Sequence, residues 1–138
     1  LHFYFNLIFD NVVLVSANTA SETFESLLRV GEGDAVIGIS FPRYSSRTVQ
    51  ALSFARDRGA TAIAITDSET SPLTPISRYT LTARSDMASF VDSLVAPLSL
   101  VNALLVAVSQ RKNEDLAHTF RTLEEIWEEY NVYEKVPE

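Results

Sequence analysis

The sequence predicts an α/β fold, built as a three-layer, doubly wound parallel sheet flanked by helices. Two observations lead to this prediction. Short β-branched apolar runs alternate along the chain with amphipathic segments of helical period. These runs are continuous rather than alternating, which is typical of strands buried on both faces in a parallel sheet. With 138 residues and no visible linker or internal repeat, residues 1–138 are expected to form a single domain.

The first part of the chain predicts two helices and two strands. Leu1–Phe9 is apolar at nearly every position and predicts the end of a buried helix. Asn11–Ser16 (NVVLVS) predicts a buried strand. Ala20–Val30 predicts a helix that ends at Gly31, with Phe24, Leu27 and Leu28 on one face. Asp34–Ser40 predicts the second strand.

The rest of the chain continues the alternation. A helix is expected over Ser46–Arg58, a strand over Thr61–Asp67 and a turn-rich loop over Ser68–Pro75. A shorter strand is expected over Ser77–Ala83, followed by helices over Met87–Gln110 and Glu114–Tyr130. In the first of these helices Val49, Leu52 and Ala55 are expected to face inward. The long apolar helix is expected to be disturbed near Pro97, because proline lacks the N–H that a helix interior needs.

The charge distribution argues against nucleic-acid binding by this chain alone. The net charge is −7, and the acidic excess lies mainly near the C-terminus, between Glu124 and Glu138. A surface of this sign repels phosphate backbones. We interpret the glutamate cluster as a solvated helix face.

Several other classes of function are excluded. No cysteine is present, and the two histidines, His2 and His118, are far apart, so no metal site is predicted. The longest apolar stretch, Leu94–Val108, is shorter than the roughly 20 residues of a membrane span and is interrupted by polar residues and Pro97. No membrane association is therefore expected.

One loop combines features that suit phosphate binding. A hydroxyl-rich segment follows the strand expected over Asp34–Ser40 and leads directly into a helix. Its hydroxyl residues are Ser40, Ser45, Ser46 and Thr48. First-turn N–H groups of a helix have no intrahelical partner, and the helix dipole favours an anion there. Ligands of doubly wound sheets also bind at the carboxyl ends of strands. The alternative is an ordinary turn whose serines only cap the helix.

The order of these segments resembles the sugar isomerase (SIS) domain. The segment GDAVIGIS precedes the hydroxyl loop and its helix, and GATAIAITDS, SPL and FVDSLVAPLSLVNALLVAV follow. The resemblance runs from about Asn11 to about Asn131. It is greatest to the SIS domain at the C-terminus of RpiR-type bacterial transcriptional regulators. The ITDS–SPL segment and the SLVAPLSLVNAL helix are its most specific parts.

The resemblance implies a phosphosugar-binding domain that dimerises. In RpiR-type regulators a helix-turn-helix domain precedes the SIS domain and binds DNA, and the sugar phosphate tunes that binding. The expected partners are therefore a sugar phosphate effector and a second copy of the chain, in a homodimer or higher oligomer. DNA is expected to be contacted only through a helix-turn-helix domain that this sequence lacks. Such a regulator is expected in the cytoplasm, with no cofactor and no metal.

The family's phosphate loop reads S-x-S-G-x-T. Aligned without a gap, Ser40 matches the first serine and Ser45 takes the place of the threonine. Arg43 then stands where the family has glycine, and its guanidinium is a candidate fork donor to the phosphate. Aligned with a gap, Ser45 and Thr48 match the later hydroxyls, which keeps Ser46 and Thr48 as candidate ligands.

The family's first strand normally precedes a long helix, and this sequence begins inside that helix at Leu1. We therefore expect an N-terminally truncated domain that lacks its first strand. Apolar surface and backbone groups left by that strand would favour an oligomer that covers them. The helix Met87–Gln110 is expected to bury one face against the sheet and another against a partner subunit.

The sequence offers few groups for isomerase chemistry, which needs a general base and usually a ring-opening histidine. Glu22, Glu69 and His118 form no evident acid–base pair, so no catalytic residue is assigned. Asp34 and Asp67 are expected to shape turns at strand ends. The sequence therefore predicts a ligand-sensing regulatory domain. Two alternatives stay open, namely an aldose–ketose isomerase using Glu22 and a dimerisation domain whose pocket binds nothing.

Overall fold

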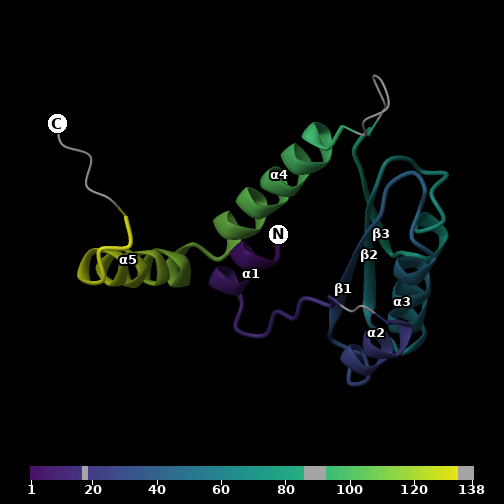
Figure 1. The fold of residues 1–138 in the computed structure, drawn as a ribbon, viewed down its shortest axis with the longest axis horizontal. Coiled ribbons are helices and arrows are strands. Elements are labelled where there is room, and N and C mark those ends of the chain that lie inside the picture. The colour runs from purple at the N-terminus through teal and green to yellow at the C-terminus, as the bar shows by residue number, and fades with distance from the viewer. Residues whose placement is uncertain (17–18, 86–92, 134–138) are drawn as a thin grey trace. The chain divides into compact units, whose positions relative to one another are not determined.

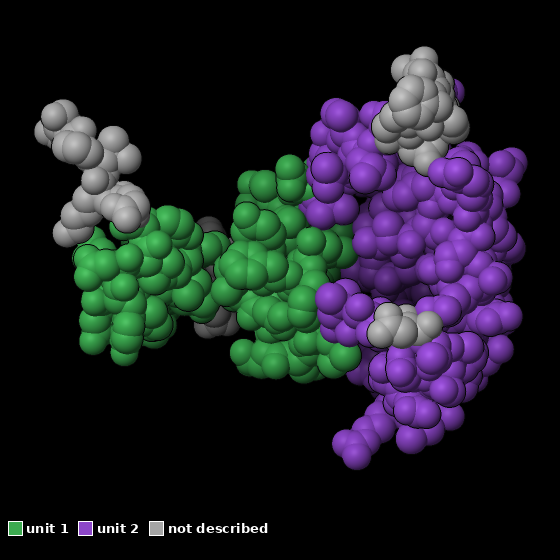
Figure 2. All heavy atoms as spheres, in the orientation of Figure 1, with its two compact units in different colours: residues 1–13, 102–138 green, residues 14–101 purple. Residues whose placement is uncertain are grey.

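The structure is a computed structural model that describes residues 1–16, 19–85 and 93–133. The chain divides into two compact units, which Figure 2 shows in different colours. One unit comprises residues 14–101 and contains the sheet. The other comprises residues 1–13 and 102–138, and its described secondary structure is helical.

A parallel sheet forms the centre of the larger unit (Figure 1). Its strands are β1 (Ala35–Ile39), β2 (Thr61–Thr66) and β3 (Tyr79–Thr82), in the order β1-β2-β3. Both pairs are parallel, with Ala35 opposite Thr61 in one register and Ile63 opposite Tyr79 in the other. The strands predicted over Asp34–Ser40, Thr61–Asp67 and Ser77–Ala83 therefore correspond to β1, β2 and β3. The predicted α/β class, with a parallel sheet flanked by helices, is confirmed.

Helix α3 (Ser46–Asp57) packs on β1 and β2. Leu52 and Ala55 are fully buried, and Val49 packs against the core cluster, so the predicted inward face is confirmed. Gly38 of β1 permits this close approach, because a Cβ there would lie 3.1 Å from Leu52 Cδ2. Gly59 follows the C-cap residue Arg58, and its φ of +89° suits the left-handed residue just past a helix C-terminus.

The hydrophobic core of this unit lies between α3, the sheet and the segment after β2. Leu52, Ala62, Ala64 and Leu73 are its buried members. Leu73 belongs to the SPL segment and precedes the short 3-10 helix η1 (Thr74–Ile76). The segment after β2 therefore contributes to the core as well as forming a turn.

Helix α2 (Ala20–Ser26) is shorter than the predicted Ala20–Val30. A capping box starts it, in which Glu22 N donates to Thr19 Oγ1 and Thr19 N donates to Glu22 Oε2. Leu27 is buried and Phe24 makes an edge-to-face contact with Phe54 of α3, with ring centroids 5.3 Å apart. Leu28 is exposed, so its predicted place on the buried face is wrong. The chain leaves the helix at Leu27, which turns Leu28 outward.

The strand predicted over Asn11–Ser16 is wrong, since these residues form neither strand nor helix. Val13 and Leu14 are exposed, and Ser16 N donates to the nearby Leu14 carbonyl. A β-branched run becomes a strand only where a neighbouring strand supplies hydrogen bonds. Among the described residues, β1 pairs with β2 alone, and no strand pairs with its other side.

Helix α4 (Val95–Arg111) begins later than the predicted Met87–Gln110. Residues 87–92 of that prediction lie outside the described residues, and residues 93 and 94 are not helical. Pro97 lies in the first turn, where its missing N–H would have no intrahelical partner anyway. Pro97 therefore lies at the start of the helix and does not disturb its interior, contrary to the expectation from the sequence.

The smaller unit contains α1 (His2–Ile8) and α5 (Asn113–Glu129), which are in contact. The Lys112 ammonium, just before α5, lies 5.7 Å from the centre of the Phe9 ring. At the other end of α5, Trp127 and Tyr133 make an edge-to-face contact with ring centroids 5.3 Å apart. Both terminal helices predicted from the sequence are present, but the prediction that the first one is buried is wrong, because Phe3 and Tyr4 are exposed and no residue of α1 is buried. No helix within the described part of the chain is long and apolar enough to span a membrane.

Candidate functional site

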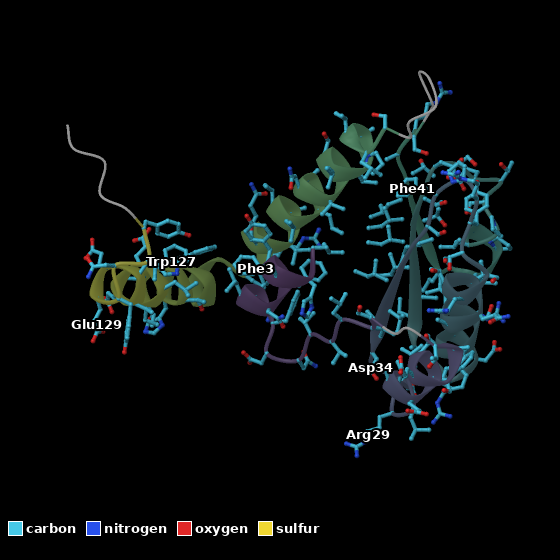
Figure 3. The ribbon with its side chains drawn as sticks, viewed as in Figure 1. Phe3, Arg29, Asp34, Phe41, Trp127 and Glu129 are labelled. Carbon is cyan, nitrogen blue, oxygen red and sulfur yellow. The ribbon has the colours of Figure 1, made fainter. Side chains whose placement is uncertain are left out.

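The candidate site lies at the carboxyl edge of the sheet, where β1 and β2 end side by side. Because the two strands are parallel, the loops that follow Ile39 and Thr66 leave the sheet at the same edge. Phe41 marks this edge in Figure 3, and Asp34 marks the opposite edge. Both the hydroxyl loop and the ITDS–SPL segment therefore belong to one edge.

Ser40 and Ser45 are brought together directly. Ser40 follows β1, is 8% exposed, and donates its backbone N–H to the Ile65 carbonyl at 3.2 Å. Its Oγ accepts a hydrogen bond from Ser45 N at 3.0 Å, which closes the loop between them. This bond uses one lone pair of the Ser40 hydroxyl and leaves its proton to donate elsewhere.

The start of α3 supplies the remaining hydroxyls. Ser45 is the N-cap residue, and its Oγ accepts from Thr48 N at 3.3 Å. Ser46 is the first helical residue and is exposed, whereas Thr48 is half-buried. Ser45 therefore fulfils the capping role that was the alternative interpretation. Capping by Ser45 is compatible with a ligand, because the Ser45 hydroxyl that accepts from Thr48 N still has a proton to donate.

Arg43 has a backbone conformation that favours glycine. Its φ is +66°, in the left-handed region that glycine enters freely and other residues rarely adopt. The Arg43 side chain is exposed. Arginine therefore occupies a position whose backbone conformation favours glycine.

The structure reveals a contact that the sequence analysis missed. Tyr44 OH donates to Asp67 Oδ1 at 2.7 Å and so joins the loop after β1 to the loop after β2. The Thr66 hydroxyl lies 3.2 Å from the same carboxylate oxygen and 2.8 Å from Ser71 Oγ. Ser71 Oγ accepts from Leu73 N at 3.3 Å, which extends the network to the core. Asp67, expected only to shape a turn, is a hydrogen-bond acceptor between two loops.

The two partners of this contact have opposite pKa shifts. Partial burial raises the pKa of Asp67, but hydrogen bonds from Tyr44, from its own backbone and from Thr66 and Ser68 outweigh burial, so the pKa is lowered overall. The hydrogen bond to Asp67, together with burial and the nearby negative charge, raises the pKa of Tyr44. The pair is therefore a carboxylate and a neutral phenol at neutral pH.

The other polar residues considered in the sequence lie elsewhere. Glu22 is engaged in the capping box of α2, and Glu69 and His118 are exposed. Asp34 shapes a turn, as expected, because its Oδ2 accepts from Gly31 N at 3.0 Å. Among the residues that the structure describes, no group of three or more His, Asp or Glu side chains is placed to hold a metal ion.

A separate hollow of about 310 Å³ lies at the opposite edge of the sheet. Arg56, Thr61, Ser77 and Arg78 are among the residues that line it. The Arg56 guanidinium already pairs with Asp57, at 2.7 Å. This hollow contains none of the hydroxyl residues predicted from the sequence, so it is distinct from the candidate site.

The geometry defines a parallel α/β domain that carries a hydroxyl-rich loop at its strand ends. The particular family follows from comparison, because the family model for the SIS domain matches residues 1–107. The chain therefore belongs to the SIS domain family. An uncharacterized HTH-type transcriptional regulator of Caldanaerobacter subterraneus subsp. tengcongensis is 29% identical over 105 residues. That match covers 73% of this chain and 37% of the regulator, so the chain spans little more than a third of its relative.

Two solved structures share the fold. The sugar isomerase domain of the RpiR transcription factor from Sphaerobacter thermophilus is 28% identical, with a TM-score of 0.79. The match covers 89% of this chain and 68% of that one. The Vibrio vulnificus NanR protein, solved in complex with ManNAc-6P, is 17% identical with a TM-score of 0.73, and the match covers 91% of this chain and 48% of NanR. The resemblance to the SIS domain of RpiR-type regulators is confirmed.

Proposed function

We propose that this chain is the phosphosugar-binding effector domain of a bacterial transcriptional regulator of sugar metabolism. The observation that carries the proposal is the loop from Ser40 to Thr48, in which Ser40 and Ser45 meet at the first turn of α3. Membership of the SIS family supports it, as does the similarity to two transcriptional regulators.

The phosphate would be held by hydroxyls and helix amides together. Ser40 and Ser45 would donate through their hydroxyls, with Ser46 and Thr48 beside them at the helix start and Arg43 as a further donor. Each hydrogen bond to a charged group contributes roughly 1.5–3 kcal/mol, so a few of them suffice to bind a metabolite. The helix dipole of α3 adds favourable charge at the same end.

We propose a regulatory role rather than catalysis. The described carboxylates nearest to an isomerase role, Glu22 and Glu69, are a helix cap and an exposed loop residue, and His118 lies in the other unit. The domain would act in the cytoplasm, as part of a longer regulator. DNA would be contacted by a helix-turn-helix domain of that regulator.

We also propose that the domain works as a homodimer or higher oligomer through α4. Within α4, Val95 is 73% exposed, Leu98 is 60% exposed and Val106 is also exposed. Apolar residues in such number along one helix are typical of a subunit interface. A dimerisation domain with an empty pocket is the competing function, and the bulkier Arg43 at the glycine position favours it.

Thermal unfolding against a panel of ligands tests the proposal. The panel contains ManNAc-6P, glucose 6-phosphate and fructose 6-phosphate, with the free sugars and inorganic phosphate as controls. A ligand at 100 times its Kd stabilises the native state by about 2.7 kcal/mol, which raises the unfolding temperature by several degrees. We expect a shift with one sugar phosphate that is lost when Ser40→Ala and Ser45→Ala are combined. A shift with none of them would contradict the proposal and leave the dimerisation domain.

A further inference from the structure

Tyr44 joins the two loops at the carboxyl edge of the sheet, and it carries a function that its sequence position does not reveal. We infer that Tyr44, held by Asp67, is a positioning residue that fixes the loop from Ser40 to Thr48 in the form that receives the phosphate. The inference rests on the proposed function and deepens it. Neither side chain needs to touch the ligand for this role.

The loop needs such a restraint because its backbone is unfavourable for its sequence. Arg43 has a φ of +66°, which a residue with a Cβ adopts only where the surroundings enforce it. A chain free to relax at Arg43 would move Tyr44 and Ser45, the next two residues. Ser45 is the N-cap of α3, so its position decides where its hydroxyl and the first helix amides point.

Two hydrogen bonds enforce this conformation from either side of the loop. Ser45 N donates to Ser40 Oγ at 3.0 Å, within the loop itself. Tyr44 OH donates to Asp67 Oδ1 at 2.7 Å, across to the loop after β2. The first bond depends on a hydroxyl that the ligand would also contact. The second is made outside the predicted ligand set and can hold the loop before a ligand arrives.

Tyr44 is well suited to transmit the restraint. Its ring packs against the core cluster of Leu52, Ala62, Ala64 and Leu73, so the side chain is fixed at both its body and its hydroxyl. Asp67 is fixed in turn, because the Thr66 hydroxyl lies 3.2 Å from Oδ1. Thr66 is fully buried and also contacts Ser71. The loop is thereby anchored to the interior rather than to another surface group.

The consequence is a preorganised binding loop. Immobilising a side chain or a loop in the free protein spares the ligand that cost and tightens binding. Removing only the Tyr44 hydroxyl should therefore weaken sugar phosphate binding although every predicted ligand residue remains. A residue with a purely structural role would lower the stability of the free protein and leave the Kd unchanged.

The test is titration calorimetry on single substitutions. The probe is whichever of ManNAc-6P, glucose 6-phosphate and fructose 6-phosphate binds the wild type most tightly. Tyr44→Phe and Asp67→Ala should each raise the Kd by about three- to tenfold. Asp67→Asn keeps an oxygen that can accept from Tyr44 and should restore the Kd to within about twofold of the wild-type value. Tyr79→Phe is the matched control, because Tyr79 is 54% exposed and lies on β3.

Two further readouts make the result unambiguous. The double variant of Tyr44→Phe with Asp67→Ala should have the Kd of either single variant, because both changes remove the same bond. Amide hydrogen exchange of residues 43–48 in the free protein should accelerate in Tyr44→Phe, while exchange of β2 stays slow.

The inference is overturned if Tyr44→Phe binds as tightly as the wild type, or if Tyr79→Phe weakens binding as much. It is also overturned if the two changes add in full in the double variant. Failure of the proposed function is a different outcome, in which the wild type itself binds none of the three compounds. The positioning role then falls together with the function that it serves.

Discussion

At the scale of single residues, the most telling position is Arg43. Arginine stands here, and its φ of +66° lies in the left-handed region that favours glycine. Residues held in a conformation against their own preference cluster at functional sites. The sequence indicated the substitution, but only the structure reveals that the backbone accommodates it rather than refolding the loop.

Arg43→Gly and Arg43→Ala separate the side chain from the backbone. Both variants remove the guanidinium, but only glycine relieves the left-handed strain. Relief of the strain should make Arg43→Gly more stable than Arg43→Ala by about 1 kcal/mol of unfolding free energy. The greater unfolded-state entropy of glycine reduces this difference. Urea unfolding of the two variants measures this difference. Equal stability would mean that the loop is not strained at Arg43.

The pair of Tyr44 and Asp67 makes the stability depend on pH at both extremes. Asp67 has a lowered pKa, so its contribution is present above the unfolded value of about 3.9 and is lost as the pH falls through the folded value. Tyr44 has a raised pKa, so its contribution is present below the unfolded value of about 10 and is lost as the pH rises through the folded value.

We therefore expect Tyr44→Phe to cost about 1 kcal/mol of unfolding free energy near pH 7 and progressively less below about pH 4. Urea unfolding of the wild type and the variant at pH 3, 5 and 7 measures the difference. The effect of the control change Tyr79→Phe on the unfolding free energy should be the same at all three pH values. A cost that is the same at pH 3 and pH 7 would contradict an ionised Asp67 as the acceptor.

At the scale of secondary-structure elements, the sequence predicts those elements that depend on a local pattern. It does not predict whether a strand forms where that depends on a neighbouring strand. The continuous apolar runs of β1 and β2 and the helical periodicity of α3 are local patterns, so these elements could be predicted. Asn11–Ser16 has the same β-branched character, but it forms no strand, since no described strand lies beside it to pair with.

The candidate site shows the same division. The meeting of Ser40 and Ser45 follows from a strand that ends where a helix begins, and the sequence predicts it. The bond between Tyr44 and Asp67 joins residues 23 positions apart. It could be found only once β1 and β2 were known to be neighbours. A tyrosine and an aspartate just past the ends of adjacent parallel strands are the signal that was available.

The contact between α3 and β1 depends on a missing side chain. A Cβ at Gly38 would lie 3.1 Å from Leu52 Cδ2 and 3.5 Å from Leu73 Cδ2, which is tighter than ordinary packing. Gly38→Ala is expected to destabilise the fold by about 1–3 kcal/mol through overpacking. Ala35→Gly in the same strand is an exposed comparison. Thermal unfolding measures both, and an unchanged or higher unfolding temperature for Gly38→Ala would show that α3 can move away freely.

At the scale of the whole molecule, the exposed apolar residues of α4 predict self-association. Val95 and Leu98 lie three residues apart and so share one helix face. Combining Val95→Glu with Leu98→Glu places two charges on that face and should convert the oligomer to a monomer in sedimentation velocity. Gln110→Glu adds charge near the end of the same helix as the control. A wild type that sediments as a monomer at high concentration would refute the interface.

The central claim is that the carboxyl edge of this sheet binds a sugar phosphate. Titration calorimetry of the wild type with the best sugar phosphate and with its unphosphorylated sugar tests this most directly. We predict saturable binding of the phosphate ester, no binding of the free sugar, and loss of at least tenfold in affinity when Ser40→Ala and Ser45→Ala are combined. Equal binding of ester and free sugar, or full affinity in the double variant, would contradict the claim.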